Sequence, residues 1–159
     1  MEEWDLLNEN RELTGKTHIR GEKLAPGELH LVIHVCIFNE KGQLLIQKRQ
    51  KDKEGWPNYW DLSAAGSALK GETSQQAAER EVQEELGIMI DLSGTRAKFS
   101  YHFEEGFDDY WFITKRRATK RFNITERRSC RRPFCHQRRV RSIKKFRRIH
   151  SLLLFKPAI

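Results

Sequence analysis

Apolar positions in the first two thirds of the chain mostly follow the two-residue period of β-strands. Residues 30–38 (HLVIHVCIF) are β-branched and apolar, which predicts a central strand. A turn at residues 39–42 and an apolar segment at residues 43–49 predict the returning strand of a hairpin. Residues 60–62 predict a short strand that follows the charged loop at residues 51–59.

A second hairpin is predicted from residues 98–103 and 110–114, which alternate around the polar segment 104–109. Residues 88–92 predict a short strand or a turn. Strands placed around a central helix predict an α/β (α+β) fold with a mixed sheet packed against helices.

Between residues 73 and 87 the apolar period becomes helical. Thr73, with Gln76 three residues on, predicts an N-terminal capping box, and Gly87 predicts the left-handed end of the helix. An apolar stripe follows one side of this helix: Ala78, Val82 and Leu86. The helix should therefore lie on a core and turn its glutamates outward.

Three of those glutamates lie on one helical face, because Glu81, Glu84 and Glu85 are three and four residues apart. Their charges repel one another, and a hard divalent cation such as Mg²⁺ or Mn²⁺ would reverse that cost. The preceding loop, residues 66–71, contains glycines that let its backbone approach a metal ion or a phosphate. Taken alone, three glutamates more often form a solvated acidic face.

The wider spacing changes that interpretation, because residues 66–88 fit G-x5-E-x7-R-E-U-x-E-E-x-G-U, where U is aliphatic. The matching positions are Gly66, Glu72, Arg80, Glu81, Val82, Glu84, Glu85, Gly87 and Ile88. This segment resembles the signature of the Nudix (MutT-like) hydrolases. The resemblance implies an α/β/α sandwich with a mixed sheet, and hydrolysis of a diphosphate linked to another group, as in a nucleoside-diphosphate-X substrate.

The resemblance also implies roles for the box residues. The metal ligands would be the Gly66 carbonyl with Glu81, Glu84 and Glu85, which would hold Mg²⁺ or Mn²⁺. The catalytic residues would be Glu81, Arg80 and Glu84, with Arg80 orienting a glutamate and Glu72 supporting the loop.

Residues outside the box give weaker expectations. The general base is a box glutamate or a glutamate of a later loop, for which Glu104 and Glu105 are candidates. Trp56, Tyr59 and Trp60 could stack on a base or an isoprenoid, although packing in the core or a loop is the favoured interpretation.

Three segments resemble the branch related to isopentenyl-diphosphate isomerase: residues 4–16, 29–49 and 55–66. That isomerase uses a cysteine and a histidine near the start of the box, and further histidine ligands. Residues 63–67 (SAAGS) contain neither, and His18 is poorly spaced to join His30 as a ligand. Hydrolysis is therefore favoured, and isomerisation is the alternative.

The 159 residues fit one domain with a core. The apolar runs are too short to span a membrane, and the acidic N-terminus lacks a signal segment. The three cysteines form no disulfide framework, and Cys36 is expected in the core. We therefore expect a cytoplasmic protein. The resemblance implies a small-molecule diphosphate substrate, and homodimers are common in the family that the chain resembles.

Charge divides the chain into a Nudix domain at residues 1–114 and a basic tail at residues 115–159. Residues 1–114 hold 13 Lys and Arg against 21 Asp and Glu, whereas residues 115–159 hold 17 against Glu126 alone. The tail stands where the family fold requires a last strand and helix. It has too few apolar positions to bury as those elements would. We therefore expect irregular or poorly packed structure at residues 115–150.

Two interpretations of the tail remain open. The first is a nucleic-acid arm, because dense Arg and Lys bind phosphates non-specifically. The second is an inactive product of a shifted reading frame near Lys115. Codons for residues 126–154 can be chosen so that reading from the second nucleotide spells a strand and a capped amphipathic helix. This second interpretation is the favoured one.

Overall fold

The structure, a computed structural model, describes most of the chain: residues 1–52, 57–115 and 140–143. The chain divides into two compact units. The first comprises Met1–Ile37 and Leu62–Ile113, and the second comprises Phe38–Asp61 and Thr114–Ile159. Residues 66–88 lie within the first unit, so the fold of that unit positions the candidate site.

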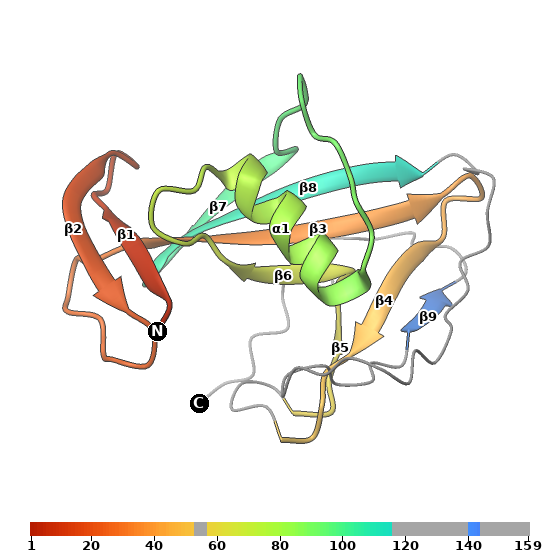
Figure 1. The fold of residues 1–159 in the computed structure, drawn as a ribbon, viewed down its shortest axis with the longest axis horizontal. Coiled ribbons are helices and arrows are strands. Elements are labelled where there is room, and N and C mark those ends of the chain that lie inside the picture. The colour runs from red at the N-terminus through yellow and green to blue at the C-terminus, as the bar shows by residue number, and fades with distance from the viewer. Residues whose placement is uncertain (53–56, 116–139, 144–159) are drawn as a thin grey trace. The chain divides into compact units, whose positions relative to one another are not determined.

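The first unit contains a mixed sheet built from four strands (Figure 1). These strands are β3 (His30–Asn39), β6 (Ala64–Ser67), β7 (Phe99–Phe103) and β8 (Gly106–Lys115). β6 pairs antiparallel with β3, and β7 pairs antiparallel with β8. β3 and β8 are neighbours, and their arrows point the same way in Figure 1. This sheet confirms the predicted central strand and the second hairpin.

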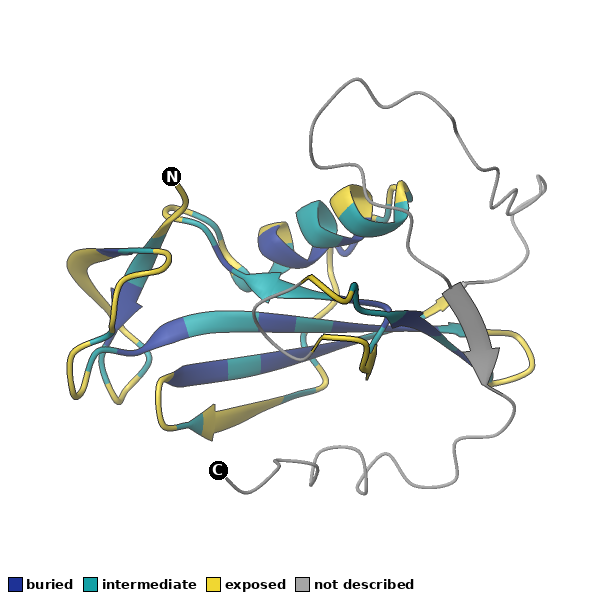
Figure 2. Ribbon diagram, turned by 90° about the horizontal axis from the view of Figure 1, so that it is seen from below, coloured by how far each residue is buried: buried dark blue, intermediate teal, exposed yellow. Residues whose placement is uncertain are grey.

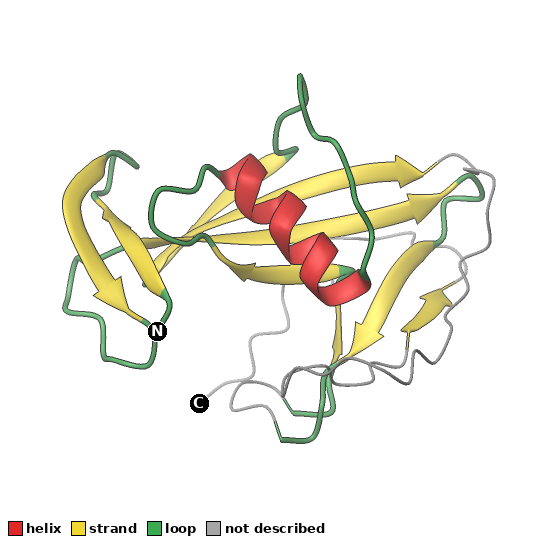
Figure 3. Cartoon of the chain, viewed as in Figure 1, coloured by secondary structure: helices red, strands yellow, loops and turns green. Residues whose placement is uncertain are grey.

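One helix, α1 (Ser74–Leu86), covers one face of this sheet above β6 (Figure 3). Its sheet-facing side is buried and its far side is exposed (Figure 2). The core between them consists of fully buried residues: Ile33, Val35, Ala64, Ala77, Ala78 and Val82. Within the described residues α1 is the only helix, and it cannot cross a membrane because it is short and polar.

A hairpin formed by β1 (Glu3–Leu7) and β2 (Leu13–Ile19) was not predicted from the sequence. The pairing register shifts between Asp5 and Leu7, which interrupts the alternation that marks a strand. The hairpin is fixed by a small apolar cluster of Leu7, Leu29 and Phe107, against which Leu31 packs.

Three local expectations need correction. Gly66 belongs to β6, so the loop before the helix is shorter than predicted. The second hairpin turns at Glu104 and Glu105 alone, because β8 already begins at Gly106. Residues 88–92 form irregular backbone without a strand. Cys36 is buried, as predicted.

The second unit contains the end of β3 with β4 (Leu44–Lys48), β5 (Trp60–Asp61) and β9 (Val140–Ile143). Phe38 pairs with Leu44, which confirms the first predicted hairpin. β9 comes from the basic tail and pairs antiparallel with β4, so the tail supplies one short strand to this unit. The rest of the expectation for residues 115–150 lies outside the described residues.

Candidate active site

Helix α1 begins and ends where the sequence predicts. The Thr73 hydroxyl accepts the Gln76 backbone N–H at 3.2 Å, and the Gln76 side chain accepts the Thr73 N–H at 2.9 Å. These two bonds form the predicted capping box. At the other end, Gly87 has a φ of 66° and donates its N–H to the Gln83 carbonyl, which closes the last turn.

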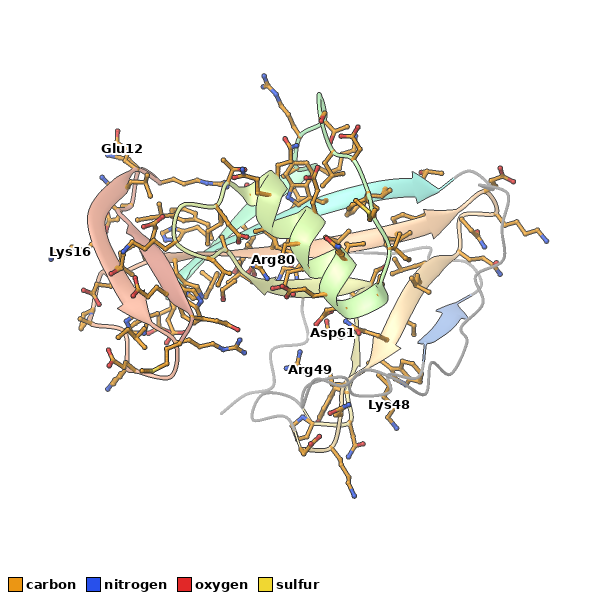
Figure 4. The ribbon with its side chains drawn as sticks, in the orientation of Figure 1. Glu12, Lys16, Lys48, Arg49, Asp61 and Arg80 are labelled. Carbon is orange, nitrogen blue, oxygen red and sulfur yellow. The ribbon has the colours of Figure 1, made fainter. Side chains whose placement is uncertain are left out.

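Arg80 lies at the centre of the site and joins the helix to the preceding loop (Figure 4). Its Nε and Nη2 donate to the two carboxylate oxygens of Glu72, at 2.8 and 3.0 Å. Nη2 also donates to the Ser67 carbonyl of β6 at 3.0 Å. Nη1 donates to Glu81 at 2.7 Å and to Glu84 at 3.2 Å. A single guanidinium therefore positions three box glutamates.

Glu72 supports the loop from within. Its carboxylate accepts the Leu69 backbone N–H at 2.8 Å in addition to its two bonds from Arg80. Burial alone would raise the pKa of Glu72, but the bonds from Arg80 and Leu69 outweigh burial and lower it. Glu72 is thus held as an anion that links the loop to Arg80.

Glu81 does not point outward, which corrects the expectation of an exposed acidic face. Its side chain lies over Gly66, where an added Cβ would come 2.1 Å from the Glu81 Oε1 atom. Only glycine therefore leaves room for this carboxylate. Burial raises the pKa of Glu81 to about 7, against the lowering effect of Arg80, and the neighbouring Glu85 and Glu84 raise it further.

Glu84 and Glu85 complete the acidic group on the more open side of the helix. The Glu84 side chain is exposed, and Glu85 is half-buried. In the described part of the chain, no three acidic, histidine or cysteine side chains are already arranged around a single metal position. Instead, the Arg80 Nη1 atom lies between Glu81 and Glu84 and donates to both carboxylates.

The chemistry of these residues nevertheless fits a hard divalent cation. A desolvated carboxylate with two carboxylate neighbours is stabilised by added positive charge, and Mg²⁺ and Mn²⁺ prefer oxygen ligands. Gly66 lies directly beneath Glu81, so the backbone at this position can approach the same ion. The residues that would hold the ion are Gly66, Glu81, Glu84 and Glu85.

The other predicted residues lie outside this cluster. Glu104 and Glu105 are exposed in the β7–β8 turn. The side chains of Tyr59 and Trp60 are exposed in the second unit, which excludes core packing for them. Trp56 lies outside the described residues.

A second polar cluster beside the helix was missed from the sequence. Asp109 of β8 is 2% exposed and accepts bonds from Arg11 and Ser100. Ser74, at the start of α1, bonds Asp109 and accepts the Trp111 indole N–H at 3.0 Å. Arg11 and Asp109 are 98 residues apart, so no local pattern could have shown their pairing.

Comparison with known families assigns the chain. The model of the NUDIX domain matches residues 28–139. The chain belongs to the Nudix family. This match includes the whole box and extends past residue 114, where the charge of the sequence changes.

The chain is similar to Nudix proteins over more than half of its length. An uncharacterized Nudix hydrolase from Listeria innocua is 93% identical over 115 residues, which are 72% of this chain and 68% of that protein. Nudix hydrolase 3 from Arabidopsis thaliana is 44% identical over 90 residues, 56% of this chain but 12% of that protein. The crystal structure of DR0079 from Deinococcus radiodurans superposes with a TM-score of 0.62 and 28% identity over 72% of each chain.

The chain is also similar to an isomerase. The isopentenyl-diphosphate Delta-isomerase from Salmonella heidelberg is 42% identical over 74 residues, which are 46% of this chain and 41% of that enzyme. The positions before the box are structural here. Ser63 is fully buried, and its hydroxyl accepts the Ile37 N–H at 2.8 Å. The ring of His30 stacks on Trp4, and its Nδ1 bonds the Glu105 carbonyl at 2.9 Å.

Proposed function

We propose that this Nudix protein is a hydrolase that needs Mg²⁺ or Mn²⁺ and cleaves a diphosphate linkage in a nucleoside-diphosphate-X or related substrate. The observation that carries the proposal is the charge imbalance around Arg80. One guanidinium contacts three carboxylates, and burial keeps Glu81 from ionising readily. A site built for structure alone has no need of that excess negative charge.

Each box residue has a task in this proposal. The Gly66 carbonyl with Glu81, Glu84 and Glu85 would hold the cation, which neutralises the diphosphate and lowers the pKa of an attacking water. Arg80 keeps Glu81 and Glu84 oriented through its Nη1 atom. The general base is a carboxylate that the cation leaves free, either a box glutamate or Glu104 or Glu105 of the β7–β8 turn.

The direct test measures phosphate or nucleoside monophosphate release from a panel of nucleotide, sugar and isoprenoid diphosphates, with Mg²⁺ and with EDTA. We expect Glu84→Gln and Glu85→Gln each to lower kcat by about 100-fold or more, because each removes an anionic ligand of the cation. Glu79→Gln is the matched control, since Glu79 lies on the same helix and accepts the Leu92 N–H at 2.7 Å and the Gln75 side-chain N–H at 3.2 Å, with no bond to Arg80 or a box glutamate.

Two results would contradict the proposal. One is hydrolysis that continues unchanged in EDTA. The other is full activity in both Glu84→Gln and Glu85→Gln, with the helical content of the wild type.

Isomerisation remains the second candidate because of the similarity to the isomerase. Incubation with isopentenyl diphosphate distinguishes the two reactions, since isomerisation yields an allylic diphosphate and releases no phosphate. We expect no isomerisation, because residues 63–67 offer neither a thiol nor an imidazole.

A shifted reading frame from about Lys115 is our proposal for the basic tail. The 93% identity to the Listeria innocua relative extends over 115 of the 159 residues and leaves the remaining 44 unmatched. A relative that similar should continue to match if both chains were read in one frame. Sequencing the coding DNA tests this directly. A +1 frame that encodes no strand and helix pattern would reject the proposal.

The alternative tail function is nucleic-acid binding. It predicts binding to RNA or DNA that weakens steeply with salt and disappears when the chain is truncated at Thr114. Hydrolysis and binding can then be assigned separately to the box and to the tail.

A further inference from the structure

The loop that leads into the Nudix helix is held by the N-terminal hairpin. The Asp5 carboxylate of β1 accepts the Gly71 backbone N–H at 2.6 Å. Next to it, the Lys70 N–H donates to the Glu3 carbonyl at 2.8 Å, and the Lys70 ammonium lies 3.0 Å from the Glu3 carboxylate. β1 thus contacts two successive residues of this loop.

Gly71 is the position at which the loop turns toward the site. Its φ of +80° lies in the left-handed region, which glycine adopts without strain. The next residue is Glu72, whose two carboxylate oxygens accept hydrogen bonds from Arg80. A bond that fixes the Gly71 amide therefore fixes the start of the chain of contacts that runs through Glu72 and Arg80 to Glu81.

The hairpin can act as a fixed support because it is itself anchored. Leu6 and Leu7 are buried, and the Leu7 N–H donates to the Leu29 carbonyl at 2.7 Å. The pairing register shifts between Asp5 and Leu7, and such a shift bends the strand next to Asp5, the residue that bonds the loop. At the far end of the hairpin, Arg11 is paired with the buried Asp109.

The hairpin precedes the residues that match the family model, which begin at residue 28. We propose that Asp5 is a positioning residue for the hydrolytic site, acting through Gly71, Glu72 and Arg80 to hold Glu81 and Glu84 where the cation binds. This inference rests on the proposed function only through the cation site, and it concerns a segment outside the matched domain.

The neighbouring ion pair of Glu3 and Lys70 supplies a control. Both side chains are well exposed, at 44% and 58%, and exposed pairs contribute little. Lys70→Gln removes that pair but leaves the Lys70 backbone bond and the Asp5 bond in place. It therefore alters the same junction without disturbing the proposed route to the site.

The experiment uses the full chain with Asp5→Ala, Asp5→Asn and Lys70→Gln. Hydrogen exchange of the Gly71 amide is followed by NMR without metal, and Mn²⁺ affinity is measured by electron paramagnetic resonance. We expect Asp5→Ala to speed Gly71 exchange and to weaken Mn²⁺ binding about three- to tenfold, less than the roughly 10- to 100-fold typical of groups that bond a metal ligand directly, because Asp5 acts through Gly71 and Glu72. Asp5→Asn keeps an acceptor and should recover most of the affinity, and Lys70→Gln should match the wild type.

The inference is overturned if Asp5→Ala binds Mn²⁺ like the wild type, whatever happens to its melting temperature. It is also overturned if Asp5→Asn and Lys70→Gln weaken binding equally, because the effect would then be general loosening of the hairpin. If Asp5→Ala does not fold, Asp5→Asn decides, because its neutral amide is a weaker acceptor than the carboxylate: a loss of Mn²⁺ affinity beyond that of Lys70→Gln supports the inference, and an affinity equal to that of the wild type overturns it. Failure of the proposed function differs from these results, since the wild type would then bind Mn²⁺ without hydrolysing any diphosphate.

Discussion

Two arginine–carboxylate clusters lie on the first unit, and they differ in how their charges balance. In the first, Arg11 faces the single buried carboxylate of Asp109. Burial would raise the pKa of Asp109, but bonds from Arg11, Ser100 and Ser74 hold it below its ordinary value. In the second, Arg80 faces three carboxylates, and the pKa of Glu81 rises to about 7.

This difference separates a structural cluster from the cluster that we propose to be functional. A buried carboxylate that is fully paired stabilises the native state in its charged form. A buried carboxylate with too little positive charge around it destabilises its charged form and gains from a cation. The balanced cluster joins the hairpin to β8 and to the start of α1, whereas the unbalanced cluster is the proposed cation site.

The largest expected effect comes from neutralising one acid in each cluster. Asp109→Asn should lower the free energy of unfolding by about 2 kcal/mol, because it breaks an ion pair whose carboxylate is buried, although Arg11 is partly exposed and keeps its bond to Ser100. Glu81→Gln should leave that free energy unchanged or raise it by about 1 kcal/mol, because an amide has no charge to desolvate. Urea unfolding in EDTA at pH 7.5 measures both. Equal losses in the two variants would remove the distinction between the clusters.

The pH dependence of stability should have opposite signs for the two acids. Between pH 4.5 and about 7, folded Glu81 keeps a proton that the unfolded chain has lost, so its contribution to stability falls as pH rises. The loss should reach about 2 kcal/mol. Asp109, with its lowered pKa, contributes stability above pH 3.8 that is lost as pH falls through its folded pKa.

Unfolding curves across this range, for the wild type and Glu81→Gln, isolate the Glu81 contribution as their difference. Saturating Mg²⁺ should abolish the fall above pH 4.5, because the cation favours the ionised carboxylate. A difference curve that is flat without metal would show that Glu81 ionises normally.

Gly66→Ala should affect activity more than stability. The new Cβ would come 2.1 Å from the Glu81 Oε1 atom, so the flexible end of that side chain must leave its place over β6. We expect kcat/KM to fall about tenfold or more, since small displacements of catalytic groups are costly. The melting temperature should change little.

Ala65→Ser is the control for this variant. Alternate residues of a strand face opposite sides of the sheet, so the side chain of residue 65 points away from Glu81. An equal fall in kcat/KM for Ala65→Ser would refute this explanation.

The helix that carries the unbalanced cluster could be predicted from the sequence because its signals are local. Thr73, Gln76 and Gly87 determine its ends within a few residues. The burial of Glu81 was missed, although it follows the buried Ala77 by four residues and thus borders the apolar stripe. Helical spacing shows which glutamates share a face of the helix. Which of them is buried depends on the strand that packs against the helix, and here Glu81 lies over Gly66 of β6.

The balanced cluster could not be predicted, because its partners are brought together only by the tertiary fold. Arg11 lies in a turn with a left-handed φ of 65°, and Asp109 lies in a strand, between Asp108 and Tyr110. The hairpin that carries Arg11 was also missed. Its exposed second strand has no apolar alternation, and the register shift interrupts the first.

The smallest expected effect concerns Ser74, which links the balanced cluster to the helix. Ser74→Ala removes a bond to Asp109 and leaves the Trp111 indole N–H without its acceptor. The free energy of unfolding should fall by about 1 kcal/mol, the usual contribution of one such hydrogen bond.

A double-mutant cycle with Trp111→Phe separates the two bonds of Ser74. Trp111→Phe should add its own packing loss, but the cost of Ser74→Ala should shrink in that background because one of the two bonds is already absent. Additive losses would mean that Ser74 acts through Asp109 alone. In both cases hydrolysis should keep its dependence on Mg²⁺ concentration, because Ser74 supports the cluster that does not bind the cation.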